Sequence, residues 1–173
     1  MIEEIPLEVR RREMMIAMLP SLELQLTEWM EASRQGLVAQ RGRLVCASGE
    51  ILLGFSDWLV SGQDKLELRL LDLVLIEIPS EKRGQGWFTS LRRKLLAEMP
   101  FAGIHYEFTR NSRLFEHFRR EGLLLVDDED GSFVELRPNI LGRLGTSPVL
   151  TRKPGWLYAG VPPAWDSAIS PVG

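Results

Sequence analysis

The chain has 173 residues, of which 45% are hydrophobic and 26% charged, and its formal net charge is -3. This composition is typical of a soluble globular protein, long enough to bury a sizeable core in one domain with an appendage. The acidic balance argues against a nucleic-acid partner or an anionic membrane, because phosphate-rich surfaces attract proteins with a positive field.

The cysteine and histidine content limits the disulfides and metal sites that the chain can form. The single cysteine, Cys46, excludes an intrachain disulfide, and its apolar neighbours indicate a core residue. The two histidines, His105 and His117, do not complete a structural zinc set with it, so we expect no metal. No apolar run approaches the length of a membrane span, and we expect a cytoplasmic protein without a membrane partner.

The first fifth of the chain is predicted to form two short helices. Pro6 suits a first helical turn, with Leu7–Leu19 helical behind it. Pro20 interrupts this pattern. A second apolar stripe then recurs at helical spacing and is expected to end near Gly36. The stripe consists of Leu22, Leu26, Trp29 and Met30.

Three strands are predicted next, near Arg43–Ser48, Ile51–Val60 and Leu66–Ile78. Glycine-containing pairs separate them, as is typical of turns between strands. The third strand is almost continuously apolar at its end, which favours a strand covered on both faces.

After the third strand, helices and strands are predicted to alternate. We expect a helix over Trp87–Glu98, a strand over Phe101–Phe108 and a helix over Asn111–Glu121. Asp130 and Gly131 stand between two apolar runs, which predicts a hairpin.

The composition changes at Pro138, and we therefore divide the chain into a domain of residues 1–137 and a C-terminal arm of residues 138–173. The arm contains six of the ten prolines, together with Trp156, Tyr158 and Trp165. Aromatic residues among prolines indicate a docked segment rather than a plain linker. The sequence leaves open whether the arm docks on its own domain, on another protein or on a second copy.

A basic, glycine-bearing turn separates the third strand from the next helix. It contains Lys82, Arg83, Gly84 and Gly86. A helix start offers unpaired amides and a partial positive charge, and glycine lets a ligand approach the backbone closely. The turn therefore indicates a phosphate or pyrophosphate site. It does not match a nucleotide P-loop, and Thr89 stands where a dinucleotide fingerprint has its third glycine.

Two segments carry a more specific resemblance. The run Arg83-Gly84-Gln85-Gly86 after a strand resembles the acyl-CoA signature of the GNAT superfamily, the general-control-related N-acetyltransferases. The segment "NSRLFEHFRREGLL", which starts at Asn111, resembles the same family's later helix in register. The resemblance covers roughly residues 43–136. Two positions depart from the family pattern: Phe88 replaces a small residue, and Phe118 replaces a tyrosine that serves many members as the general acid.

The resemblance implies an α/β (α+β) fold with a GNAT-like mixed, mostly antiparallel central sheet flanked by helices. It implies acetyl-CoA as co-substrate, held in a gap where the strand ending at Ile78 splays from its neighbour. The amides of Ile76 and Ile78 would pair with the pantetheine arm, and Asn111 would face its thiol end. The pyrophosphate would rest on the amides of Arg83, Gly84, Gln85, Gly86, Trp87 and Phe88.

Acyl transfer to an amine also needs a base and an acid. Asp72 is the first candidate base, and strand alternation predicts that it shares a face with Val74, Ile76 and Ile78. Its alternative role is an ion pair with Arg69 or Lys65. Glu107 and His105 are further candidate bases that also suit structural roles. Tyr106 and Tyr158 are the available substitutes for the missing acid.

Two functions follow as hypotheses. The first is an acyl-CoA-dependent N-acyltransferase that acetylates an unidentified amine. The second is a catalytically degenerate GNAT-fold protein that acts through binding in a larger assembly, which Phe88, Phe118 and the arm favour. Arg92, Arg93 and Lys94 either touch the nucleotide end of the cofactor or form a solvated helix face.

Overall fold

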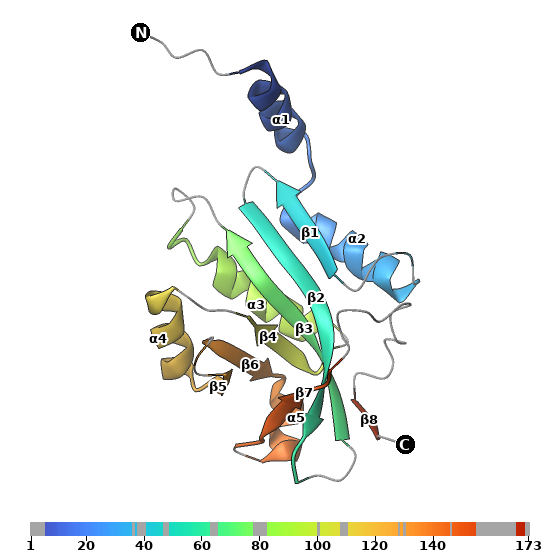
Figure 1. The fold of residues 1–173 in the computed structure, drawn as a ribbon, viewed down its shortest axis with the longest axis vertical. Coiled ribbons are helices and arrows are strands. Elements are labelled where there is room, and N and C mark those ends of the chain that lie inside the picture. Colours follow the sequence, from blue (N-terminus) through green and yellow to red (C-terminus); the bar gives the residue numbers. More distant parts are fainter. Residues whose placement is uncertain are drawn as a thin grey trace.

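The computed structural model describes residues 6–35, 37, 41–46, 49–62, 66–77, 83–99, 101–107, 111–127, 129, 131–145, 147–154 and 169–171. Two helices precede three strands, and helices and strands alternate after them (Figure 1). The helices are α1 (Leu7–Ala17), α2 (Leu22–Arg34), α3 (Trp87–Glu98), α4 (Ser112–Glu121) and α5 (Pro138–Leu144). The strands are β1 (Arg41–Cys46), β2 (Gly49–Val60), β3 (Leu66–Glu77), β4 (Gly103–Tyr106), β5 (Leu124–Asp127), β6 (Ser132–Leu136), β7 (Leu150–Arg152) and β8 (Ile169–Pro171).

The strands form one mixed sheet in the order β1-β2-β3-β4-β6-β5, with β7 paired to β2 and β8 paired to β3. β3 and β4 run parallel, whereas the other described pairs are antiparallel. The predicted architecture, a mostly antiparallel central sheet flanked by helices, is therefore confirmed. The hairpin predicted around Gly131 is also confirmed, because β5 and β6 pair directly.

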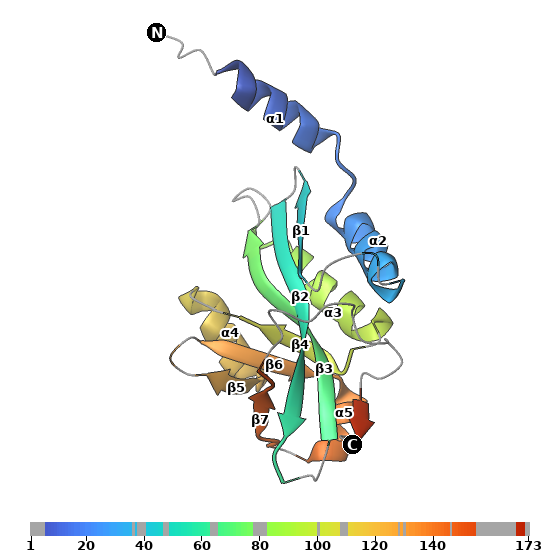
Figure 2. The ribbon, with the colours of Figure 1, turned by 45° about the vertical axis from the view of Figure 1, so that its right-hand side comes forward.

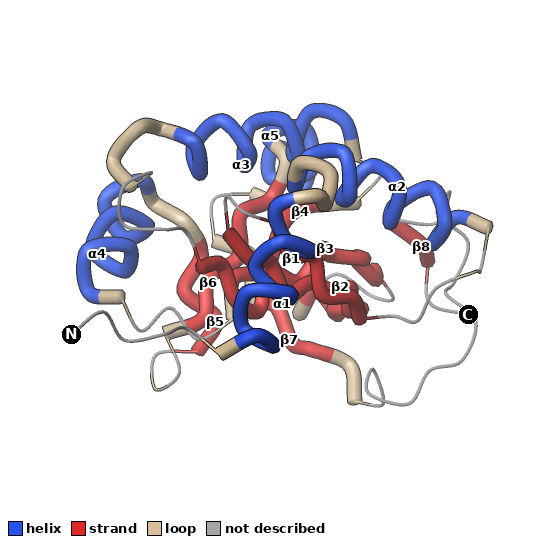
Figure 3. Tube along the Cα trace, turned by 90° about the horizontal axis from the view of Figure 1, so that it is seen from above, coloured by secondary structure: helices blue, strands red, loops and turns tan. Residues whose placement is uncertain are grey.

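Helices α2, α3 and α4 pack on one face of the sheet, which we call the helix face (Figure 3). Its core joins Leu22 and Leu26 of α2, Leu91 and Leu95 of α3 and Phe118 of α4 to the sheet residues Leu71 and Leu73. The other face, which we call the opposite face, carries a second buried cluster with Leu68, Leu70 and Val134. β3 thus contributes to a core on both sides, as its apolar sequence predicts.

A β-bulge in β3 changes which side chains share a face. Leu53 pairs with Leu73, but the next residue back on β2, Leu52, pairs with Leu75, so Val74 is the extra residue. The strand therefore reverses its alternation at this point. Asp72 lies on the opposite face, whereas Ile76 packs against the core of the helix face. The prediction that both side chains share one face is wrong, because it assumed a regular strand.

The first helix projects from the body of the molecule (Figure 2). α1 buries none of its residues, and Met14, Met15 and Met18 are largely exposed. Its predicted existence is confirmed, with an end at Ala17. Within the described ranges, no helix combines the length and the apolar character needed to cross a membrane.

The described part of the C-terminal arm packs on the domain. α5 buries Ile140, β7 extends the sheet beside β2, and β8 pairs with β3. Lys153 forms an ion pair with Glu67 at 2.9 Å, which ties β7 to β3. The three aromatic residues that suggested a docked arm, Trp156, Tyr158 and Trp165, lie outside the described residues.

Candidate functional site

A cavity of about 520 Å³ lies where the end of β3, the glycine turn and the starts of α3 and α4 meet. This volume is in the range of small-molecule and cofactor sites. The cavity brings the two predicted motifs together, although they lie far apart in the sequence. Its wall consists of Ile76, Arg83, Gly84, Gly86, Trp87, Phe88, Thr89, Asn111, Arg113, Leu114 and His117.

The turn before α3 has the backbone that its glycines predict. Gly84 and Gly86 have φ angles of 75° and 74°, in the left-handed region that favours glycine. Gly86 is the N-cap of α3 and provides no side-chain cap, and the first turn of α3 holds no acidic residue. The helix start therefore faces the cavity with its amides and positive dipole end, which suits an anion.

Cationic side chains add to this anion-favouring field. Arg83 of the turn and Arg113 of α4 line the same cavity, together with His117 one helical turn further on. Two arginines beside a helix N-terminus provide charge-assisted donors for phosphate oxygens. Of the other predicted cofactor residues, Gln85 lies in the exposed turn without lining the cavity, and Ile78 lies outside the described residues.

Trp87 fixes the turn to the rest of the molecule. Its indole Nε1 donates to Glu23 Oε1 of α2 at 2.9 Å. Partial burial favours the neutral form of Glu23, but hydrogen bonds from the backbone and from Trp87 outweigh it and lower the pKa of this carboxyl. No sequence pattern links residues 64 positions apart, so this anchor could not be predicted.

Asn111 has a structural role besides its place on the cavity wall. Its Oδ1 accepts hydrogen bonds from the backbone amides of Arg113 and Leu114, at 3.0 and 3.3 Å. This is the ordinary N-cap of a helix, and Gly122 ends the same helix in the left-handed conformation. The side chain thus sets the orientation of α4 at the cavity.

Phe118 stands in the core rather than at a polar site. It is fully buried, and its ring lies 4.5 Å from the Tyr106 ring and 6.3 Å from Phe88. The hydroxyl of Tyr106 donates to Glu135 Oε2 at 2.6 Å. Burial and the Glu135 carboxylate raise the pKa of Tyr106 well above its usual value, so the phenol stays protonated at neutral pH. The proton that Tyr106 would donate as an acid is hydrogen-bonded to Glu135. The role of Tyr106 as the general acid stays a prediction.

Sequence reasoning missed an ion cluster around Arg92. The guanidinium is buried on α3 and bonds both oxygens of Glu135, at 2.8 and 3.0 Å, and Glu121 at 2.7 Å. Although burial opposes it, these bonds raise the pKa of Arg92 further. Neither predicted role holds for Arg92, since it neither lines the cavity nor faces solvent. Arg93 and Lys94 are exposed, as a solvated face requires.

Within the described residues, the parallel pairing of β3 and β4 runs to Leu73 and Tyr106, and a further hydrogen bond runs from the Glu107 amide to the Leu73 carbonyl at 3.0 Å. β3 continues to Glu77, whereas residues 108–110 after Glu107 lie outside the described residues. Glu107 therefore lies at the end of the described pairing of these two strands.

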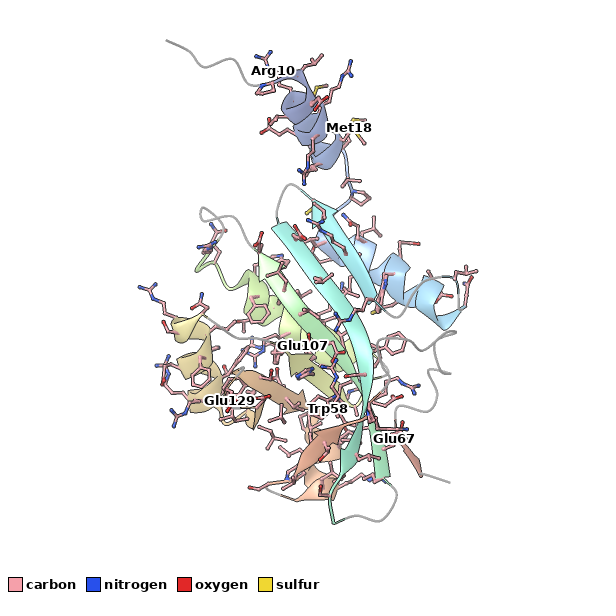
Figure 4. All side chains as sticks on the ribbon, in the orientation of Figure 1. Arg10, Met18, Trp58, Glu67, Glu107 and Glu129 are labelled. Atoms are coloured by element: carbon pink, nitrogen blue, oxygen red, sulfur yellow. The ribbon has the colours of Figure 1, made fainter. Side chains whose placement is uncertain are left out.

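Charged residues form a buried cluster on the opposite face beside this point. Asp72 accepts from Ser56 Oγ at 2.7 Å and contacts His105 Nδ1 at 2.9 Å. Arg152 of β7 donates to Asp72 at 2.9 Å and to Glu107 at 2.5 Å (Glu107 and Trp58 are labelled in Figure 4). Asp72 is thus ion-paired, as its alternative role proposed, but with an unforeseen partner.

The partners that the sequence suggested for Asp72 are placed differently. Arg69 pairs with Asp57 at 2.8 Å, and Lys65 lies outside the described residues. Arg152 belongs to the C-terminal arm, 80 positions from Asp72. No motif marks it in the sequence, so only the pairing of β7 with β2 reveals its role.

Asp72, His105 and Glu107 are residue types that ligate metals, and their potential ligand atoms lie within 4.8 Å of one another. The guanidinium of Arg152 bonds both carboxylates and supplies their positive partner. The arrangement is therefore that of an ion-paired cluster with a protein cation.

No family model and no curated protein matches the sequence. Several solved structures are similar in fold, and three of them are described here. AtaT complexed with acetyl-methionyl-tRNAfMet is 14% identical, with a TM-score of 0.43, over 72% of this chain and 86% of that chain. The KacTA–DNA complex is 18% identical, with a TM-score of 0.42, over 74% and 89%. A mutant AtaT toxin bound to the C-terminus of the antitoxin AtaR and acetyl-CoA is 18% identical, with a TM-score of 0.41, over 73% and 85%.

These likenesses concern the fold, and at TM-scores below 0.5 they carry no argument about function. The fold assignment rests on the sheet order, the bulge and the glycine turn of this chain. The expectation that this chain has no nucleic-acid partner, which rests on its net charge, stays a prediction.

Proposed function

We propose that the protein is an acyl-CoA-dependent N-acyltransferase that transfers an acetyl group to an amine. The observation that supports this most strongly is the cavity, whose wall joins Ile76 and Asn111 to five residues of the glycine turn: Arg83, Gly84, Gly86, Trp87 and Phe88. The GNAT resemblance assigns all of these residues to acyl-CoA.

In this proposal the cofactor lies with its charged end on the turn. The helix start after Gly86 receives the pyrophosphate, with Arg83 and Arg113 as cationic donors. The pantetheine arm extends past Ile76 towards the end of the described pairing of β3 with β4, and Asn111 lies along its course. Ile78 belongs to the same prediction but lies outside the described residues.

The chemistry follows from the position of the thioester. A base first takes one proton from the incoming ammonium. The neutral amine then attacks the thioester carbonyl carbon, the C–N bond forms and the C–S bond breaks; the second proton of the nitrogen goes to the CoA thiolate, which leaves as the thiol. We assign the role of base to Glu107, because it lies at the end of the described pairing of β3 with β4 and its side chain is 5% exposed, whereas Asp72 is fully buried among three polar partners. The thiolate is a tolerable leaving group without the tyrosine that Phe118 replaces.

Acetyl-CoA binding is the first test. Isothermal titration is expected to give a dissociation constant in the micromolar class, which is about −8 kcal/mol. ADP serves as a control that shares the pyrophosphate but lacks the pantetheine arm, and it should bind more weakly. The absence of any heat of binding at millimolar acetyl-CoA would rule out the enzyme and leave the cavity without an assigned ligand.

The base assignment is tested by comparing two amide variants. Glu107→Gln is expected to lower turnover by about 10²–10⁴-fold, the usual contribution of a general base, while the acetyl-CoA affinity stays the same. Thiol release is followed with a panel of acceptors that includes a polyamine, a peptide amine and an aminoacyl-tRNA. Asp72→Asn is the comparison, and a larger loss there than in Glu107→Gln would transfer the role of base to Asp72.

The second candidate is a GNAT-fold protein that binds acyl-CoA without turning it over. Phe118 in the core and a Tyr106 hydroxyl directed at Glu135 favour it, because neither supplies an acid at the cavity. Acetyl-CoA binding without thiol release across the acceptor panel distinguishes this function from catalysis.

A further inference from the structure

Arg152 reaches the proposed base from outside the segment that resembles the GNAT family. In its guanidinium, Nη1 donates a hydrogen bond to Glu107 Oε1 at 2.5 Å and Nη2 donates one to Asp72 Oδ2 at 2.9 Å. The two carboxyl side chains are only 5% and 1% exposed, so solvent does little to weaken these ion pairs. Arg152 thus bridges the two buried carboxylates of the cluster, Asp72 and Glu107.

The strand that carries Arg152 is held in place by the sheet. Trp58 of β2 pairs with Arg152, and the Lys153 amide donates to the Asp57 carbonyl at 2.9 Å. The guanidinium also lies 5.9 Å from the centre of the Trp58 ring, within reach of a cation–π contact. The backbone and the ring together fix the guanidinium against the carboxylates.

Groups from five strands face Glu107 or its neighbour Asp72. Two are cationic: Arg152 of β7 and Arg41 of β1, which lies 3.7 Å from Glu107. The others are Asp72 of β3, His105 of β4 at 4.0 Å from Glu107, and Ser56 of β2, which donates to Asp72. Two carboxylates in one buried site do not both ionise unless a cation compensates them. Arg152 is the group that contacts both at hydrogen-bond distance.

We propose that Arg152 is a positioning residue for the acyl transfer: it orients Glu107 and balances its charge beside a second carboxylate. This inference rests on the proposed function, in which Glu107 accepts the proton of the amine. It also makes the arm part of the catalytic unit, because β7 supplies the cation that contacts both carboxylates at hydrogen-bond distance.

The pH dependence of the rate tests the proposal. Turnover falls at low pH when the base takes up a proton, and a cation in contact with the base opposes that uptake. Arg152→Gln is therefore expected to shift the acidic limb of the profile upward by about one to three pH units, the effect of a close opposite charge. Arg152→Lys keeps the charge without the two-pronged contact and should shift it less.

Lys153→Gln is the matched control, because Lys153 is the next residue and pairs with Glu67 outside the cluster. Its profile should superimpose on the wild-type profile, and all variants should keep the wild-type acetyl-CoA affinity. An unshifted limb in Arg152→Gln overturns the proposal. An equal shift in Lys153→Gln does so too, since the effect would then belong to the strand.

A readout without turnover separates this inference from the proposed function. Carbon-13 NMR of the labelled Asp72 and Glu107 carboxyls follows their ionisation directly. The carboxyl titrations should move to higher pH in Arg152→Gln but not in Lys153→Gln. Should the glutamine variant fail to fold, the turnover of the lysine variant at its pH optimum decides, because lysine keeps the charge but loses the two-pronged contact that orients Glu107; wild-type turnover there refutes the inference. Absence of acetyl-CoA binding by the wild-type protein refutes the proposed function instead.

Discussion

Gly86→Trp is expected to abolish acetyl-CoA binding. Gly86 has a φ of 74° and lines the cavity, and a Cβ added there meets no atom within 4 Å. The indole therefore has open space to enter, and it would lie over the helix start that we propose for the pyrophosphate. We expect the dissociation constant to rise by more than about 100-fold, or about 2.7 kcal/mol, as measured by isothermal titration.

Gly62→Trp is the matched control for this substitution. Gly62 also has a positive φ, 77°, and open space at its Cβ, but it lies in the turn after β2, away from the cavity. The backbone strain of the two substitutions is thus similar, whereas only one reaches the ligand. Wild-type affinity in Gly86→Trp would show that the turn is not the pyrophosphate site, and equal loss in both variants would point to a general effect on folding.

Arg92→Met is expected to be the most destabilising of the substitutions considered. The variant leaves Glu135 and the Tyr106 hydroxyl without the guanidinium that they bond, in a site where Arg92 is 5% exposed. Removal of one partner of a buried ion pair costs about 3–5 kcal/mol. Thermal unfolding should therefore begin roughly 6–20 °C lower, since 1 kcal/mol corresponds to about 2–4 °C at this chain length.

The neighbouring residue provides the control. Arg93 is exposed on the same helix, so Arg93→Met should change the free energy of unfolding by less than about 0.5 kcal/mol. A loss for Arg92→Met no larger than that for Arg93→Met would mean that the ion cluster contributes nothing net.

The contribution of Glu121 to the free energy of unfolding depends on pH. Partial burial favours its neutral form, but the hydrogen bond from Arg92 outweighs this and lowers the pKa of Glu121. A carboxyl with a lowered pKa in the folded state stabilises it at neutral pH, and this contribution is lost as the pH falls through the folded pKa. The Glu121 side chain is 38% exposed, so solvent screening keeps this contribution small.

Local patterns determined much of the fold. Apolar periodicity placed the helices, and the turn residues placed the hairpin at Gly131, because both report on contacts between residues close in sequence. Gly84 and Gly86 marked the turn correctly, since a positive φ is a local demand that glycine meets. Each of the two short motifs is also local in the sequence, and residues of both line one cavity.

Only the tertiary structure decided which charged groups meet. The bulge at Val74 puts Asp72 and Ile76 on different faces, and it depends on the register of β2 against β3 rather than on the composition of either strand. Arg152 meets Asp72 across 80 positions, and Arg92 meets Glu135 across 43. Such pairs leave no periodic trace in the sequence, because the distance between them is set by strand order and packing. The sequence by itself determined the glycine turn before α3, and the sheet decided which charged groups lie together on its opposite face.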